Sequence, residues 1–122
     1  MTDRNSGLDE DDLQSLLPFF IAQTRSRLAE IKAYRQAILN RQDTAAAMKS
    51  VRDLAHKICG TAETFGFPHL GVLARGVEDI SLADVVGSDV PAALCLQMER
   101  AIDPLIQEMF EILEPGKNST TV

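Results

Sequence analysis

The sequence predicts an all-α protein, an up-and-down antiparallel four-helix bundle with a short extra helix at its N-terminus. Three observations lead to this prediction. Alanine and leucine are frequent, and strand-forming residues occur in no alternating runs. Apolar residues recur at helical spacing in four long segments. The connections between these segments are short, and short loops make consecutive helices antiparallel neighbours.

The first half of the chain contains the short helix and two of the long ones. Asp9–Leu17 is predicted as the short helix, because its first residues are acidic and negative charge is favoured at a helix N-terminus. Pro18 then requires a helix boundary or a position in an early turn of a helix. Phe19–Asn40 and Ala45–Phe65 carry the next two apolar stripes, and the polar residues between them form a short connection.

Glycine and proline mark the ends of the remaining helices. Gly66 suits the position just after a helix end, and the next helix, Pro68–Leu82, begins with a proline that suits a first turn. The last helix is predicted to begin with Ser88 or Asp89 as its N-cap and with Pro91 in its first turn. It ends before the Pro-Gly pair near the C-terminus.

Length and composition indicate one globular domain. The chain of 122 residues is predicted to fold as a single domain over residues 8–114, between disordered segments at residues 1–7 and 115–122. The net charge of −6 comes without a stripe of lysine and arginine, which argues against nucleic acid as a partner. No sustained heptad seam is present, so a monomer is expected.

The sequence also bears on the compartment. It shows no secretory signal and no apolar run long enough to span a membrane, so a cytoplasmic location without membrane contact is expected. Cys59 and Cys95 lie far apart and form no Cys-x-x-Cys motif. Both are therefore expected to be free thiols in a reducing compartment.

His56 is the candidate functional residue. On a helical wheel it lies roughly 150° from the centre of the apolar stripe of its helix, so its imidazole should be exposed. Gly60 follows one turn later, although glycine in a helix interior costs about 1 kcal/mol relative to alanine. A side chain at position 60 would crowd the imidazole, so the glycine leaves room beside the ring. Lys49 and Arg52 share this outer face and Lys57 lies at its edge, where cations would stabilise a negatively charged group on the ring.

The stretch from Ala55 to Leu70, AHKICGTAETFGFPHL, resembles the phosphorylation motif of histidine phosphotransfer (HPt) domains of bacterial phosphorelays. The family pattern has Ala-His, an aliphatic residue, a glycine, and then an apolar-Gly-apolar turn before the next helix. A weaker similarity covers residues 16–113. The positions in register with the motif are His56, Ile58, Gly60, Ala62, Gly66 and Leu70, and Leu73, Ala74 and Glu78 also fit the family's pattern in the following helix.

The sequence departs from the family pattern at one position near the histidine. The family usually has a lysine three residues after the histidine, close to the phosphate, and this chain has Cys59 there. Lys57 is displaced by two residues and points elsewhere on the wheel. Arg52, Lys49 and Arg75 are the candidates to supply the positive charge instead.

The resemblance implies a phosphocarrier without ATP-dependent kinase activity. His56 would accept a phosphoryl group on Nε2 from the phosphoaspartate of a receiver domain, in a relay fed by a hybrid histidine kinase, and would pass it to a response regulator. No cofactor of its own is expected, because the receiver domain supplies Mg²⁺. Docking is expected around Gly60, where the first two long helices would contribute apolar surface, with candidates Leu8, Leu13 and Phe19 or Phe20.

Two alternatives stay open at this point. A degenerate HPt-like module would dock a receiver or a kinase without carrying phosphate, and Cys59 is the best support for it. A metal-binding or redox bundle could use His56, Cys59 and Glu63, but a zinc site needs a fourth ligand, so no metal is expected. His69 is interpreted as a solvated or structural residue.

Overall fold

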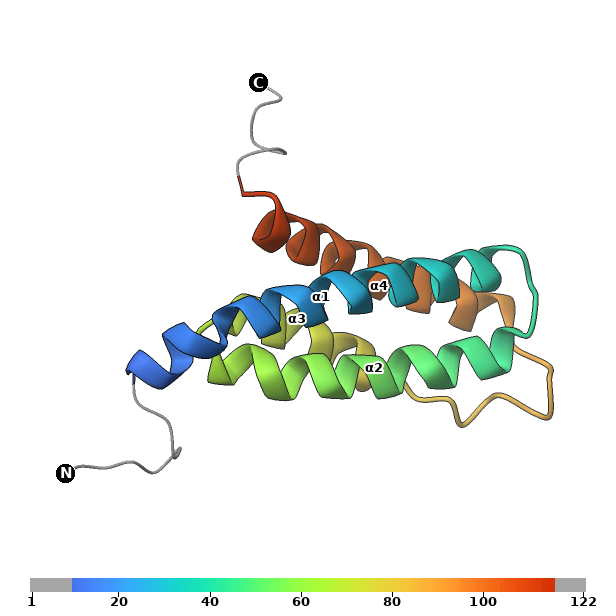
Figure 1. The fold of residues 1–122 in the computed structure, drawn as a ribbon. Coiled ribbons are helices and arrows are strands. Elements are labelled where there is room, and N and C mark those ends of the chain that lie inside the picture. The colour runs from blue at the N-terminus through green and yellow to red at the C-terminus, as the bar shows by residue number, and fades with distance from the viewer. Residues whose placement is uncertain (1–9, 116–122) are drawn as a thin grey trace, which may run out of the picture.

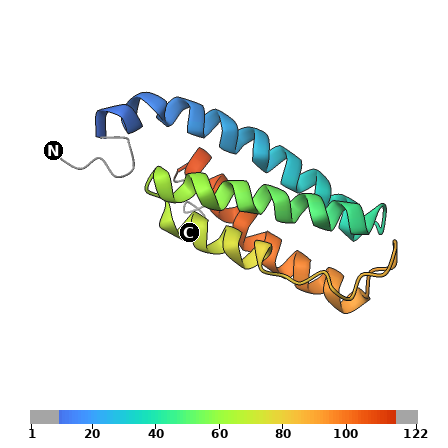
Figure 2. The ribbon, with the colours of Figure 1, turned by 90° about the horizontal axis from the view of Figure 1, so that it is seen from below.

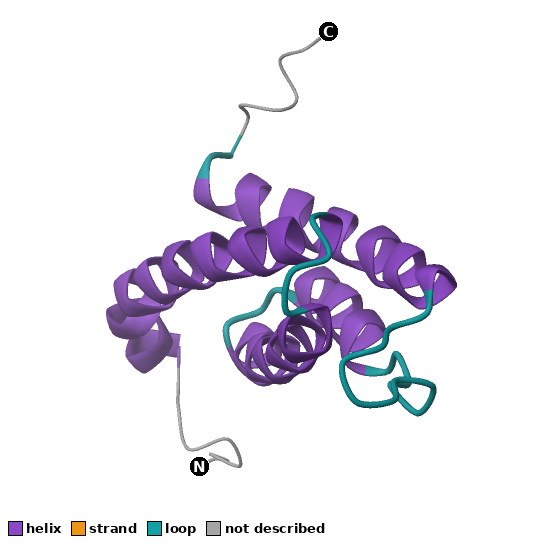
Figure 3. Ribbon diagram, turned by 90° about the vertical axis from the view of Figure 1, so that its right-hand side faces the viewer, coloured by secondary structure: helices purple, strands orange, loops and turns teal. Residues whose placement is uncertain are grey.

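The structure is a computed structural model that describes residues 10–115. These residues form the helices α1 (Glu10–Leu39), α2 (Thr44–Thr64), α3 (Pro68–Glu78) and α4 (Ala92–Leu113) (Figure 1). The other residues between 10 and 115 form the connections, and no strand is present in this described part of the chain (Figure 3). The predicted all-α four-helix bundle is confirmed.

Each helix packs against two neighbours. Helix α1 packs against α4 and α2. Helix α3 also packs against α4 and α2, so the four helices form a closed ring around the core. Helices consecutive in the sequence run in opposite directions (Figures 1 and 2). Because α3 is much shorter than α2, residues 79–91 return to the far end of the bundle as an extended connection before α4 begins.

The core lies between the four helices and is almost entirely aliphatic. The apolar stripe that the spacing predicts for α2 is buried, and removing this surface from water is the main force that holds the helices together. The largest fully buried side chains come from all four helices: Ile31, Ile38, Met48, Val51, Leu70, Val77, Cys95, Met98, Ile102, Leu105 and Met109.

The N-terminal part of the chain differs from the prediction of a separate short helix. Residues 10–17 are the first turns of α1, which continues through Pro18 without a break. The proline cannot donate a hydrogen bond to the carbonyl of Gln14. Leu17 nevertheless lies partly buried against the core, and Leu13 and Leu17 line a groove with Phe65. Tertiary packing therefore keeps this segment in line with the rest of α1.

The turn between α2 and α3 fixes how the two helices meet. Gly66 has a φ of 82° and follows the C-cap of α2, as the sequence predicts. Its amide donates to the carbonyl of Glu63 and that of Phe67 donates to the carbonyl of Ala62, which is the Schellman arrangement. The ring of Phe20 on α1 stacks on both Phe65 and Phe67. The turn is thus anchored to α1.

Two predicted boundaries in the second half are wrong. The helix predicted to reach Leu82 ends at Glu78, because the chain turns there and buries Ile80. The last helix has Pro91 as its N-cap, and neither Ser88 nor Asp89 takes that place. Those two residues belong instead to a tight turn around Gly87, which is closed by paired hydrogen bonds between Val86 and Asp89.

The helices occupy most of the domain predicted for residues 8–114. The segments predicted to be disordered, residues 1–7 and 115–122, lie outside the described residues except for Pro115, which forms a turn after α4. Among residues 10–115, no helix is both long and apolar enough to cross a membrane.

Candidate functional site

His56 projects from the middle of α2 into solvent. Its side chain is 74% exposed, whereas Ala55 and Ile58 on either side point into the core. This exposure follows from the periodicity of the helix, as the sequence predicts. No neighbouring segment among residues 10–115 covers the ring.

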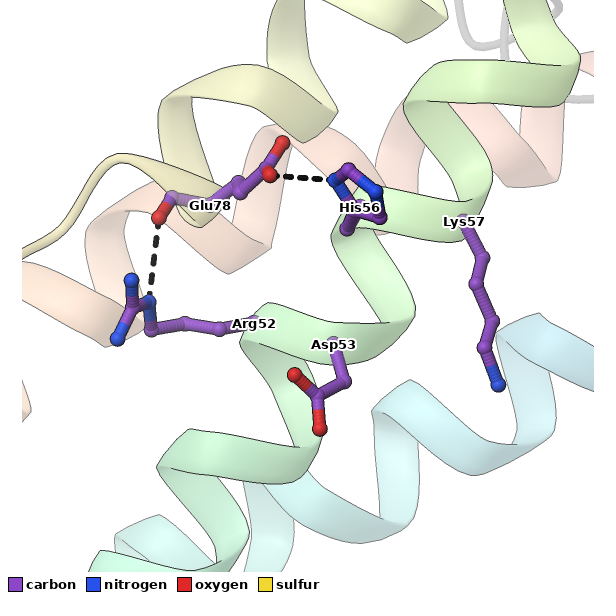
Figure 4. A pocket seen from close by; sticks show the side chains of 5 residues that line it. All are labelled: Arg52, Asp53, His56, Lys57 and Glu78. Atoms are coloured by element: carbon purple, nitrogen blue, oxygen red, sulfur yellow. Dashed lines mark hydrogen bonds and ion pairs between the residues drawn. The ribbon is translucent and has the colours of Figure 1, made fainter.

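A carboxylate on α3 holds one edge of the imidazole. Nδ1 of His56 lies 2.5 Å from Oε2 of Glu78. An ionised carboxylate only accepts hydrogen bonds, so Nδ1 carries the hydrogen and donates it. In a neutral ring this leaves the lone pair on Nε2. No residue in the described part of the chain forms a hydrogen bond or ion pair with Nε2, and Figure 4 shows that edge of the ring facing away from Glu78.

Arg52, one turn before His56, contacts the same residue of α3. Its Nε–H donates to the main-chain carbonyl of Glu78 at 3.1 Å. In Figure 4 the guanidinium lies beyond Glu78 and not at the free edge of the imidazole. The structure thus brings Arg52 to the site, but in contact with α3.

These residues line an open hollow between α2 and α3. Its volume is about 360 Å³, and its walls are Arg52, Asp53, His56, Lys57 and Glu78. Two cations and two carboxylates therefore surround the histidine. Lys57 is exposed and points away from Glu78 (Figure 4).

Gly60 lies one turn after His56 in the exposed surface of α2. A Cβ atom built at this position would meet no other atom within 4 Å. The packing of residues 10–115 therefore gives no reason for a glycine here, where alanine would favour the helix by about 1 kcal/mol.

The other three predicted support residues do not line this hollow. Cys59 is 5% exposed and faces α3, where Nη2 of Arg75 lies 3.7 Å from its sulfur. Lys49 is exposed and lines a different hollow near the start of α2. Position 59, which carries lysine in the usual family pattern, therefore lies inside the helix interface in this chain.

The metal hypothesis finds no support in the described residues. They contain no group of three or more histidine, cysteine, aspartate or glutamate side chains that could hold a metal ion. Cys59 points into the interface while His56 points into solvent. The second histidine, His69, is also exposed, and its Nε2 lies 3.9 Å from a carboxylate oxygen of Glu108.

Sequence reasoning missed the direct contact of Glu78 with His56. Glu78 had been noted only for fitting the family's pattern in its helix. A usable signal was present, because α2 and α3 are antiparallel about the turn at Gly66. Residues at similar distances before and after that turn lie opposite each other, which pairs the region of His56 with that of Glu78.

The fold and the site define a helical bundle that exposes one imidazole nitrogen to solvent. The family model of the Hpt domain matches residues 15–114, and the chain belongs to this family. Hpt domains take part in histidine phosphotransfer in phosphorelay signalling, where they are phosphocarriers and not kinases, and they interact with receiver domains and kinases. Searches of curated proteins and of solved structures gave no significant match.

Proposed function

We propose that this protein carries a phosphoryl group on Nε2 of His56, taking it from the phosphoaspartate of a receiver domain and passing it to a response regulator. One observation carries the proposal. The imidazole is exposed, its Nδ1 is held by Glu78, and its Nε2 is free. An imidazole held in this way has its lone pair on the atom that faces a partner.

The transfer step needs little from the bundle itself. The Nε2 lone pair attacks phosphorus, the Nε2–P bond forms, and the bond from phosphorus to the aspartate oxygen breaks with its electrons left on the aspartate. The ring becomes positively charged with its hydrogen on Nδ1, and the carboxylate of Glu78 stabilises that charge. Onward transfer reverses these steps on a second aspartate. Mg²⁺, which neutralises the phosphoryl oxygens, would be held by the receiver domain and not by this chain.

The receiver domain would dock over α1 and α2. Arg27 on α1 donates to Thr61 on α2, so the middle of α1 lies beside the half of α2 that carries His56 and Gly60. Leu16 and Phe19 expose apolar surface further toward the N-terminus of α1, where the neighbouring Phe20 stacks on Phe65 at the end of α2. Of the other expected candidates, Phe20 is buried, Leu13 is half-buried, and Leu8 lies outside the described residues.

A pair of substitutions tests this docking surface. Phe19 is 71% exposed on α1, and Val86 is 74% exposed on the connection between α3 and α4. Phe19→Ser is expected to raise the Kd for a receiver domain about tenfold, as for a well-buried interface residue. Val86→Ser is expected to leave the Kd unchanged. An unchanged Kd for the Phe19 variant, measured by calorimetry, would place docking elsewhere.

The proposal as a whole is tested by transfer from a panel of phosphorylated receiver domains. We expect at least one receiver to label the wild-type protein, and we expect His56→Gln to abolish labelling while circular dichroism shows an unchanged fold. His69→Gln is the matched control, because it removes the other exposed histidine. Labelling that survives in His56→Gln contradicts the proposal. Tight receiver binding without any labelling would instead identify a docking module.

The same proposal includes a cytoplasmic location and a monomeric state, since a phosphocarrier must reach several partners in turn. Sedimentation of the purified protein would test the monomer, and a dimer that buries His56 would contradict it.

A further inference from the structure

We infer that Arg52 is a positioning residue for His56, acting through Glu78 and not on the phosphoryl group itself. This inference deepens the proposed function, on which its consequence for phosphoryl transfer rests. Arg52 and His56 are one turn apart on α2, and both contact one residue of α3. Arg52 binds the main chain of Glu78, and His56 binds its side chain.

The end of α3 offers Arg52 a free carbonyl group. The Glu78 carbonyl belongs to the last turn, where carbonyl groups lack partners within the helix. The amides of the next two residues bond to the carbonyls of Arg75 and Val77, so they leave the Glu78 carbonyl free. The Nε–H of Arg52 donates to it and also brings positive charge to the negative end of the helix dipole. Arg52 thus fixes α3 at the residue that contacts the imidazole.

The orientation of the imidazole depends on Glu78. A side chain that is 74% exposed has almost no packing to hold it in one orientation. The hydrogen bond to Glu78 is its one polar contact among residues 10–115. Glu78 reaches Nδ1 through a flexible side chain, so the bond depends on where the backbone of Glu78 lies. Arg52 determines that backbone position.

The guanidinium of Arg52 is not placed to contact a phosphoryl group on Nε2. A cation that stabilises a phosphoryl group donates hydrogen bonds to its oxygens. Arg52 is half-buried, and its guanidinium lies on the far side of Glu78 from the free edge of the ring (Figure 4). Its charge therefore acts on α3, and its effect on His56 passes through the Nδ1 hydrogen bond.

The tautomer of His56 tests the inference without any phosphoryl donor. In ¹⁵N NMR spectra of the neutral ring, we expect the wild-type protein to show mainly the Nδ1–H tautomer. Arg52→Met should shift the ring to a mixture that includes Nε2–H. Arg52→Lys keeps a donor and a charge, and should keep the wild-type tautomer. Arg75→Met is the control, because Arg75 is the nearby arginine whose side chain does not contact Glu78. A wild-type tautomer in Arg52→Met would overturn the inference.

A double-mutant cycle on the transfer rate gives a second, independent readout. We expect Arg52→Met alone to slow transfer about fivefold and Glu78→Ala alone to slow it about tenfold. In the Glu78→Ala background, Arg52→Met should change the rate by less than about twofold, because the two residues act as one unit. Arg100→Met, on the exposed surface of α4, is the control for loss of an arginine.

If the rate of the double variant equals the product of the two single effects, Arg52 acts on the phosphoryl group independently of Glu78. That result would overturn the inference. If the wild-type protein accepts no phosphoryl group from any receiver, the proposed function fails. The tautomer measurement still decides the role of Arg52 in that case.

Discussion

In two helix pairs of this bundle, a side-chain hydrogen bond to a carboxylate joins one helix to the other. The two contacts differ in whether the donor side chain keeps a nitrogen without a partner. Between α1 and α4, Arg35 donates from Nε and Nη2 to the two oxygens of Asp103, at 2.6 and 3.3 Å. Between α2 and α3, His56 donates from Nδ1 to Glu78 at 2.5 Å and leaves Nε2 without a contact in the described chain.

The difference comes from the chemistry of the donor. A guanidinium has only donors, so its pair with a carboxylate can bind but cannot react. The hydrogen bond to Asp103 is the main reason that the pKa of Arg35 is raised, so the group stays charged. An imidazole has two distinct nitrogens, and a carboxylate that holds one of them directs the lone pair to the other. The same kind of contact therefore binds both partners fully on the α1–α4 side and leaves a nitrogen lone pair free on the α2–α3 side.

The largest expected effect tests whether phosphoryl transfer needs open surface beside His56 on the α2–α3 side. Gly60→Leu fills the surface beside His56 without meeting another atom of the chain at its Cβ. We expect transfer from a receiver to slow about a hundredfold, because a misplaced partner loses the reacting geometry. Gln107→Leu, on the exposed α1–α4 side, should leave the rate unchanged. A Gly60→Leu protein that is labelled at the wild-type rate would mean that no partner approaches position 60 closely.

The next effect concerns the lysine of the usual family pattern. Cys59→Lys places a charge in the α2–α3 interface beside Arg75, and we expect it to lower the free energy of unfolding by about 2 kcal/mol. Adding Arg75→Met should recover part of this loss, because it removes the like charge. Urea titrations of the two single variants and the double variant measure the coupling. Strictly additive losses would show that Arg75 does not restrict position 59.

A smaller effect compares the two carboxylates directly. Glu78→Gln removes the charge that faces the imidazole, and we expect transfer to slow about tenfold, equivalent to about 1.4 kcal/mol. Asp103→Asn should leave the rate unchanged and lower the free energy of unfolding by at most about 1 kcal/mol, since the pair is largely exposed. Equal effects of the two substitutions on transfer would remove the distinction between the two sides.

The pH dependence of the Arg35–Asp103 pair follows from the same contact. Because the pKa of Arg35 is raised on folding, its contribution is fully present below the ordinary pKa of arginine and is lost only at more alkaline pH. From about pH 5 to about pH 10, Arg35 should therefore add no slope to the stability of the protein.

The smallest expected effect concerns Gly76, the exposed glycine of α3. A Cβ atom there would meet nothing within 4 Å. Gly76→Ala should raise the free energy of unfolding by about 0.5–1 kcal/mol, because alanine favours the helix, and should leave transfer unchanged. Urea titration and the transfer assay measure the two quantities. Slower transfer would extend the docking surface onto α3.

The fold could be predicted where local sequence decides it. Apolar spacing defines the helices, and Gly66 and Pro68 define the turn between α2 and α3. The prediction of a break at Pro18 was wrong, because Leu17 packs against residues distant in the sequence. The end of α3 was misplaced for a similar reason, since Ile80 is buried outside a helix.

The site was predictable only in part. The exposure of His56 follows from the helical wheel, because it is a property of one helix. The contacts that define its chemistry join two helices, so the role of Glu78 did not follow from the spacing within α2. For the same reason Arg52 was expected near the phosphate, whereas its side chain contacts the end of α3.

The shortness of α3 divides the bundle into two unequal halves. His56 lies opposite the last residue of α3, at the border of the half in which all four helices enclose the core. The first turns of α2 lie beside the irregular residues of the 79–91 connection. Irregular segments open at lower free energy than packed helices, so amide hydrogen exchange should be fastest at the end where α2 begins. A docking partner would then contact mainly the slowly exchanging half of the bundle. The orientation of the imidazole would stay fixed while the partner binds.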